Sequence, residues 1–240
     1  MKENSFTAPT ELTIEHHAIM FALLAKYADK ECAQKGLDAI GAAVSEYGRE
    51  RGGRMAKRVL KDGLPLNMQN YLVYGEWTSK PGQMDTRIVQ KSPVQITNIH
   101  LCEWCTSWKK HNLEKYGSYY CDFVDINLVK GFNPQNDLQI DQVLSKNAPY
   151  CIFHWLGYNA TPENEAVFAA TKKAIGSSCI RDFNYHTAHL YFTMSRVLRN
   201  ILPKQGDKIV EAALEEFTSK FGEAATNAVL ALKDVDFNEI

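Results

Sequence analysis

The residues with the clearest chemical potential are cysteines in the middle of the chain. Four of the six cysteines gather there, and these are Cys102, Cys105, Cys121 and Cys151. A CxxC pair with two further cysteines can bind zinc through four thiolates, although the usual signature has two CxxC pairs. The same thiols could instead act as a redox pair, as a nucleophile, or as inert buried side chains. The cysteines alone leave these four interpretations open.

An acid accompanies one of these cysteines. Residues 118–130 are predicted to form a helix, on which Cys121 and Asp125 share a face because they are four residues apart. A buried carboxylate either pairs with a cation or has a raised pKa that suits a general base. A cap or a structural salt bridge is the other interpretation. We expect Cys121, Asp125 and Cys102 to be catalytic, with Cys102 close to the other two.

An arginine in the first part of the chain occupies a position where an apolar residue is expected. Residues 37–60 are predicted to form a helix, and Arg51 falls within its apolar stripe, one turn after Tyr47. A buried guanidinium needs a partner, because an unpaired buried charge is very costly. That partner could be a substrate carboxylate, since arginine offers a planar bidentate fork, or a buried acid such as Asp125 or Glu76.

The elements that must position these side chains indicate an α+β fold. We predict a small antiparallel sheet flanked by two helical hairpins, in a single domain over residues 1–240. The N-terminal hairpin is expected at 11–65, the cysteine-bearing segment at 66–160 and the C-terminal hairpin at 161–240. Within the central segment, strands are expected at 71–77, 86–99 and 150–156, and helices at 103–115 and 118–130.

The two expected hairpins resemble each other in sequence. Residues 186–230 repeat residues 16–60 without a gap, with identical residues such as His16/His186 and Gly36/Gly206. Arg51 of the first copy corresponds to Phe221 of the second. A hairpin of this design therefore does not need arginine there, which favours a specialised role in the first copy. Duplication and convergence both explain such a repeat.

Glycines on the second predicted helix indicate a close neighbour. Gly41, Gly48 and Gly52 line one flank of it, and each should cost about 1 kcal/mol relative to alanine. Something must therefore pack or bind very near that flank.

Composition narrows the classes of function. The chain has 27 basic and 28 acidic side chains, so charge gives no case for nucleic acid or an anionic membrane as partner. Without an N-terminal apolar signal region or a run long enough to span a bilayer, we expect a cytoplasmic protein. We expect a small-molecule substrate and no cofactor or resident metal, and the sequence also allows a homo-oligomer.

A set of short motifs occurs in a specific order and spacing over roughly residues 15–157. These motifs are HAIMFALLA (17–25), AVSEYGRERGGRMA (43–56), CEW (102–104), YC (120–121), VD (124–125), GFNP (131–134) and CIF (151–153). Together they resemble the L-2-amino-thiazoline-4-carboxylic acid hydrolase family. The resemblance implies hydrolytic opening of a small cyclic amidine-like acid. In the family's namesake reaction, water adds to the ring carbon between nitrogen and sulfur, and N-carbamoyl-L-cysteine results.

The residues can be assigned roles that suit this chemistry. Arg51 would hold the substrate carboxylate, Asp125 would bind the amidine or activate water, and Cys121 would attack or polarise the ring carbon. The side chains expected to contact the substrate or lie beside these groups are Arg54, Tyr47, Asn133, Cys151 and His154. Arg54 could equally be a half-exposed surface arginine, and His154 a satisfied strand histidine. The alternative function is a non-catalytic small-molecule- or metal-binding module resembling 4-vinyl reductase domains.

Overall fold

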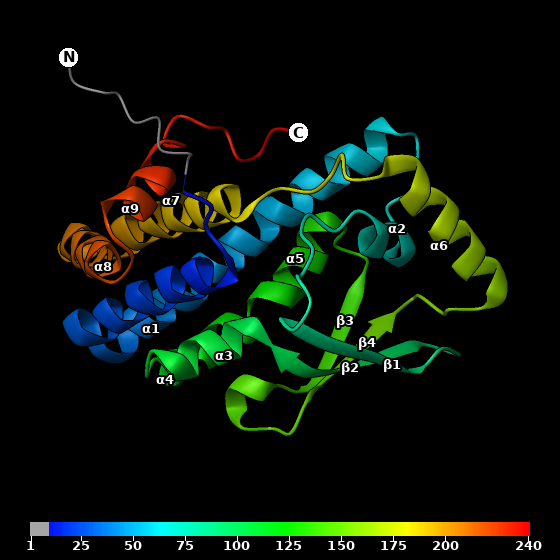
Figure 1. The fold of residues 1–240 in the computed structure, drawn as a ribbon, viewed down its shortest axis with the longest axis horizontal. Coiled ribbons are helices and arrows are strands. Elements are labelled where there is room, and N and C mark those ends of the chain that lie inside the picture. Colours follow the sequence, from blue (N-terminus) through cyan, green and yellow to red (C-terminus); the bar gives the residue numbers. More distant parts are fainter. Residues whose placement is uncertain (1–9) are drawn as a thin grey trace, which may run out of the picture.

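The computed structural model describes residues 10–240, and their arrangement confirms the α+β class (Figure 1). The helices are α1 (Ile14–Lys61), α2 (Met68–Val73), α3 (Glu103–Lys110), α4 (Glu114–Cys121), α5 (Val124–Phe132), α6 (Pro162–Ile175), α7 (Phe183–Ile201), α8 (Gly206–Phe221) and α9 (Glu223–Leu230), with a 3₁₀ turn at Leu144–Lys146. The strands are β1 (Met84–Gln90), β2 (Gln95–Cys102), β3 (Asp137–Gln142) and β4 (Cys151–Leu156). Within residues 10–240, none of these helices has both the length and the apolarity of a membrane span.

Helix α1 is the predicted N-terminal hairpin. Its two arms meet at Ala33, where φ is 48° and ψ is −134°, outside the helical region. Just after that corner the arms touch, because a Cβ on Gly36 would lie only 2.0 Å from the carbonyl oxygen of Ala28. Farther along, His17 of the first arm bonds Tyr47 of the second at 3.0 Å. Glycine at the corner therefore lets the arms run back along each other.

The second copy of the sequence repeat also forms a helical hairpin, made of α7 and α8. This hairpin packs against α1, so that both hairpins form one helical layer (Figure 1). The copies differ at their ends. At Gly222 the chain turns with a φ of 84° and begins α9, whereas the first copy continues as helix to Lys61.

The neighbour that the glycine flank predicts is α5. A Cβ on Gly52 would lie 2.1 Å from the carbonyl oxygen of Leu128, and one on Gly48 would lie 2.9 Å from that of Val124. Backbone therefore packs directly on backbone, and no larger side chain fits between the helices. This close packing holds the start of α5, which carries Asp125, against the second arm of α1.

The sheet has the order β1-β2-β4-β3, and every neighbouring pair is antiparallel. One face points toward α1 and α5. Because side chains alternate along a strand, Thr97 and Ile99 of β2 lie on this face together with their neighbours Phe153 and Cys151 of β4. These residues form the floor of the site described below.

Two predicted strands are wrong in detail. Residues 71–77 were expected as a strand, but Asn67 caps a short helix, α2, by accepting a hydrogen bond from the amide of Asn70. A short apolar run that is buried on both sides has no period that separates strand from helix. Residues 86–99 form parts of two strands, β1 and β2, joined by a turn that contains Pro93. Strand β3 was not predicted, although Leu138 and Ile140 alternate with polar residues there.

The predicted helices of the central segment are also interrupted. The first ends at Lys110, and the second is divided between α4 and α5 at residues 122–123. Cys121 therefore closes one helix while Asp125 lies in the first turn of the next. Cys121 and Asp125 therefore belong to different helices, but both side chains still line the same cavity.

Candidate active site

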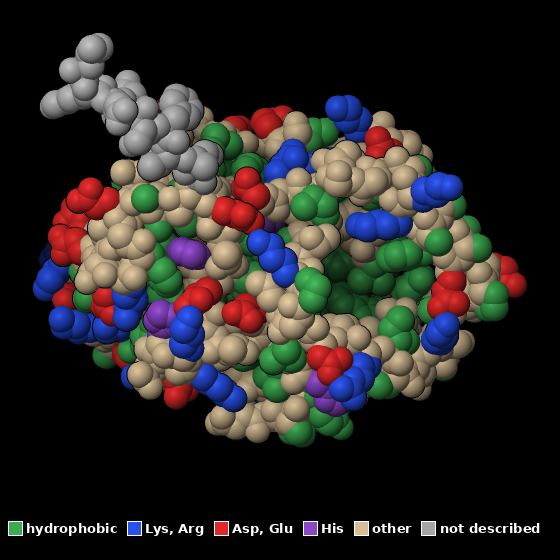
Figure 2. All heavy atoms as spheres, viewed as in Figure 1, with side chains coloured by type: hydrophobic (Ala, Val, Ile, Leu, Met, Phe, Trp, Pro, Cys, Tyr) green, Lys and Arg blue, Asp and Glu red, His purple; other side chains and the backbone are tan. Residues whose placement is uncertain are grey.

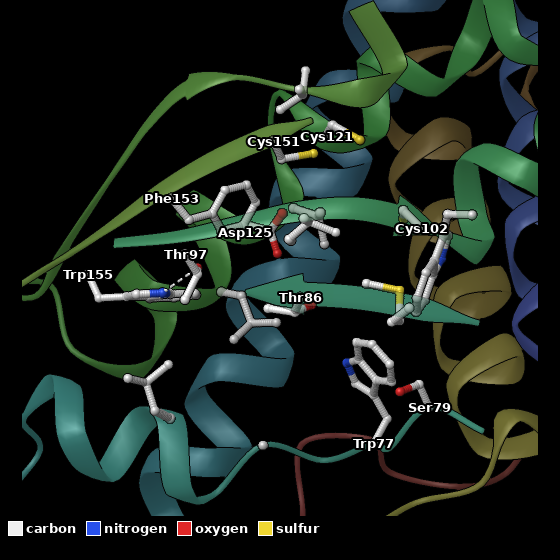
Figure 3. Close-up of a pocket in the computed structure, with 18 of the residues that line it drawn as sticks. Trp77, Ser79, Thr86, Thr97, Cys102, Cys121, Asp125, Cys151, Phe153 and Trp155 are labelled. Carbon is white, nitrogen blue, oxygen red and sulfur yellow. Dashed lines mark hydrogen bonds between the residues drawn. The ribbon is translucent and has the colours of Figure 1, made fainter. Parts of the chain in front are cut away.

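A deep cavity of about 610 Å³ lies between the sheet and the helices α1, α2 and α5. Figure 2 shows it as a hollow lined by hydrophobic side chains, and Figure 3 shows the side chains inside. Its walls are mainly apolar, and the aromatic residues among them are Tyr71, Trp77, Trp104, Tyr120, Phe153 and Trp155. The ionisable non-aromatic groups in the lining are Arg51, Glu76, Asp125, Cys102, Cys105, Cys121 and Cys151. A few polar groups in an apolar cavity are typical of a small-molecule site.

Glu76 organises the arginines beside the cavity. Its fully buried carboxylate accepts two hydrogen bonds from Arg54, at 2.8 and 2.7 Å, and one from Arg58 at 2.7 Å. Although burial alone would raise the pKa of Glu76, the hydrogen bonds from Arg54 are the main cause that holds it at about 2. Arg54 is thus a buried cation bonded to Glu76, and it does not line the cavity in which substrate contact was predicted for it.

Arg51 is the arginine that faces the cavity. Its Nε atom lies 3.6 Å from the Glu76 carboxylate and has no hydrogen-bond partner among residues 10–240. Burial opposes its charge, but Tyr47 and Glu76 nearby raise the pKa of Arg51 above its ordinary value, so it stays cationic. Arg51 and Glu76 therefore form an ion pair, but the distance between them is too long for a hydrogen bond. The guanidinium can still donate hydrogen bonds to an anion in the cavity.

Asp125 points into the cavity from the first turn of α5 (Figure 3). Burial raises the pKa of its carboxyl to about 6, and the charge of Arg51 opposes this rise. At neutral pH the carboxyl is therefore mostly ionised, yet it is a stronger base than an ordinary aspartate. A base of this strength in an apolar cavity can accept a proton from water.

The four cysteines that line the cavity are free thiols of different acidity. Cys102 stands at the N-cap of α3, and the Cys105 thiol and then the amides at that helix start lower its pKa. Cys105 itself is held protonated by Cys102 and Cys121, and burial raises the pKa of Cys151 to about 12. The surroundings of Cys102 therefore favour its thiolate form, which makes Cys102 a candidate nucleophile.

Tyr47 supports the site from behind the cavity lining. Its hydroxyl bonds Nε2 of buried His17 at 3.0 Å, and Trp104 donates to Nδ1 of the same ring at 3.1 Å. Because Nδ1 accepts a bond, the proton of neutral His17 is on Nε2 and is donated to Tyr47. The Arg51 guanidinium lies 5.6 Å from the Tyr47 ring centre. Tyr47 therefore positions Arg51 and does not itself line the cavity.

Two other predicted contacts lie away from the cavity. The amide of Asn133 donates to the carbonyl oxygen of Leu66 at 2.6 Å, which ties the end of α5 to a loop. His154 lies between two cavity-facing residues of β4, so its side chain points to the opposite face of the sheet, where it bonds Asp141 at 2.7 Å. Asn133 and His154, for which substrate contacts were predicted, therefore do not join the other predicted residues at the cavity.

Aromatic residues of the cavity were not predicted as functional. Trp77 and Tyr71 lie in the segment that was expected as a strand, and Trp104 lies in the helix expected at 103–115. Three of the four tryptophans line the cavity, Trp77, Trp104 and Trp155. A cluster of tryptophans near cysteines and an arginine is a signal that could have indicated an aromatic pocket.

The fold and cavity together define a class, an α+β protein with an apolar pocket that holds an arginine, a carboxylate and thiols. No group of three or more histidine, cysteine or acidic side chains within residues 10–240 is arranged to hold a metal ion. Residues 13–155 match the L-2-amino-thiazoline-4-carboxylic acid hydrolase family, and this match spans more than half of the chain. The chain therefore belongs to that family. No curated protein and no solved structure gives a significant match.

Proposed function

We propose that this protein is a hydrolase that opens a cyclic amidine-like acid at the carbon between ring nitrogen and ring sulfur. The observation that carries this proposal is that Arg51 and Asp125 face one apolar cavity, the first short of hydrogen-bond partners and the second with a raised pKa. Membership of the family supports the same chemistry.

In this proposal Arg51 binds the substrate carboxylate through its planar fork. Asp125 takes a proton from water as the water oxygen bonds to the ring carbon. The carbon–sulfur bond then breaks, and the proton passes from Asp125 to the leaving sulfur. The products are a free thiol and a ureido group, so water is the only co-reactant.

A thiol offers a second route to the same products. The thiolate of Cys102 or of Cys121 would attack the ring carbon and expel the ring sulfur. Asp125 would then activate water to release the bound carbon, which regenerates the thiolate. This route forms a covalent adduct, whereas direct attack by water does not.

The test is turnover of L-2-amino-thiazoline-4-carboxylate, followed by appearance of the product thiol and by mass spectrometry of the protein. We expect Arg51→Gln to raise KM about a hundredfold or more, since it removes a charged bidentate contact. Arg49→Gln, an exposed arginine two residues away on the same helix, is the matched control and should behave as the parent protein.

The variant Asp125→Asn should lose turnover, while Asp122→Asn should keep it, because Asp122 is exposed and pairs with Lys146 at 2.6 Å. An adduct that accumulates on Cys102 or Cys121 in Asp125→Asn would identify the covalent route. A folded protein that binds the acid tightly but never opens it would contradict the hydrolase and favour a binding module.

A further inference from the structure

Thiols line one end of the cavity, where Trp77 also lies near Cys102, whereas the rings of Phe153 and Trp155 line the other end, which we call the aromatic end (Figure 3). The strand pairing arranges the floor of the cavity in four successive rows of neighbouring residues. From the thiol end to the aromatic end, these rows are Met84 and Cys102; Thr86, Ile99 and Cys151; Ile88, Thr97 and Phe153; and Gln95 and Trp155. Asp125 lies beside Cys151 and Cys121, whereas Trp155 lies farther along the sheet, beyond Phe153 (Figure 3). The reacting groups therefore occupy only part of the floor.

The aromatic end is far enough away to hold a second chemical group. Trp155 lies four positions after Cys151 on β4, and a rise of about 3.3 Å per residue gives roughly 13 Å between them. At this end the ring centre of Trp155 lies 5.7 Å from that of Phe153 and 6.1 Å from that of Tyr71. Such a corner of rings favours an apolar or aromatic occupant.

The indole nitrogen of Trp155 does not call for a polar ligand. The indole nitrogen of Trp155 already donates to the hydroxyl of Thr97 at 3.0 Å. Tyr71 is buried, and its neighbours there are Phe132 at 5.6 Å and Trp155. A ligand group that fills this space therefore gains by excluding water from apolar surface.

The volume of the cavity also exceeds what a small ring acid needs. The volume of about 610 Å³ equals about twenty waters at roughly 30 Å³ each. A single five-membered ring with one carboxylate would leave most of this apolar space to water, which hydrates apolar walls poorly. Cavities of this size ordinarily enclose much larger ligands.

We infer that the substrate is a cyclic amidine-like or thiazoline-type acid that carries a bulky aromatic or apolar substituent reaching the Trp155 end. The inference rests on the proposed function in one respect, that Arg51 holds the acid. The substituent extends along the sheet between β2 and β4, while the ring stays beside Asp125 and the thiols. Specificity then comes from the aromatic end and chemistry from the thiol end.

The test compares two matched acids by calorimetry with the full-length protein. The probes are 2-methyl- and 2-(2-naphthyl)-2-thiazoline-4-carboxylate, which share the ring and the carboxylate and differ only in the substituent. We expect the naphthyl acid to bind at least tenfold more tightly. In Trp155→Ala this advantage should fall below threefold, whereas Ile152→Ala, on the other face of the same strand, should retain it.

Thr97→Phe provides a second variant if Trp155→Ala does not fold, because it fills the aromatic end and should exclude the naphthyl acid while admitting the methyl acid. Equal affinities of the parent protein for the two acids would overturn the inference. If the methyl acid still needed Arg51 in that case, the proposed function would stand. If neither acid bound, or if Arg51→Gln bound both as well as the parent, the proposed function would fail as well.

Discussion

Replacing Asp125 by asparagine should make the protein more stable at neutral pH while abolishing its activity. Burial raises the pKa of this carboxyl from an ordinary 3.8 to about 6. The folded state therefore binds a proton more tightly than the unfolded state, and stability falls as pH rises from about 4 to about 6. A pKa difference of about two units corresponds to about 3 kcal/mol at pH 7.

Two effects reduce this gain. The carboxyl borders the cavity, so water inside the cavity partly relieves the cost of its charge. Its negative charge in the first turn of α5 also interacts favourably with the helix dipole, by about 0.3–1 kcal/mol. A net gain of about 2 kcal/mol remains for Asp125→Asn, which corresponds to a rise of about 4–8 °C in Tm for a chain of this length.

The assay is thermal unfolding followed by circular dichroism at pH 7 and pH 5. The advantage of Asp125→Asn over the parent should shrink to about half at pH 5, where the folded parent is mostly protonated at this site. Asp122→Asn serves as the control and should show no such gain, since Asp122 is exposed. The reasoning is refuted if Asp125→Asn is no more stable than the parent at pH 7, or if its advantage does not depend on pH. In the parent, kcat/KM should rise with pH and level off above about 6.

Three further changes test other parts of the structure. Glu76→Gln should cost about 3–5 kcal/mol in chemical denaturation, because it leaves Arg54 buried without its carboxylate partner; a loss below 1 kcal/mol would contradict the assigned arrangement. Cys102→Ser should remove the fastest site of iodoacetamide labelling at pH 7, as read by peptide mass spectrometry, since Cys102 is the thiol whose pKa is lowered. Gly52→Ala should destabilise the fold by more than about 2 kcal/mol, whereas Gly53→Ala, whose Cβ would meet nothing closer than 3.9 Å, should be neutral or stabilising by up to about 1 kcal/mol. Equal effects of the two glycine variants would show that α1 and α5 do not pack as described.

Local sequence features predicted the helical parts of the fold well. The period of apolar residues in 14–61 and 183–221 indicates two hairpins, and Gly36 marks the corner of the first. The central segment was predicted less well, because strand pairing depends on partners far away in the chain. The turn at Pro93 makes a hairpin of what the sequence shows as one β-rich stretch, and only the antiparallel pairing of β1 with β2 reveals this.

For the candidate site, the sequence by itself determined which residue types are unusual for their positions. Arg51 within an apolar stripe and Asp125 on an inward face both follow from helical period, and both line the cavity. Which arginine is free and which is structural was decided only by tertiary structure, because Glu76 can satisfy Arg54 and Arg58 at hydrogen-bond distance but leaves Arg51 at 3.6 Å.

The acidity of the cysteines and the shape of the cavity were likewise decided only by the tertiary structure. The sequence shows the spacing of the thiols, but their acidity depends on the helix start at Cys102 and on burial around Cys151. The volume of the pocket and its aromatic end arise where β4 and α2 meet, at Trp155 and Tyr71, which are far apart in the chain. Spacing along the sequence fixes which side chains share a helix face or a strand face, whereas distances between elements, and hence charge pairing and cavity shape, are fixed only by how the elements pack.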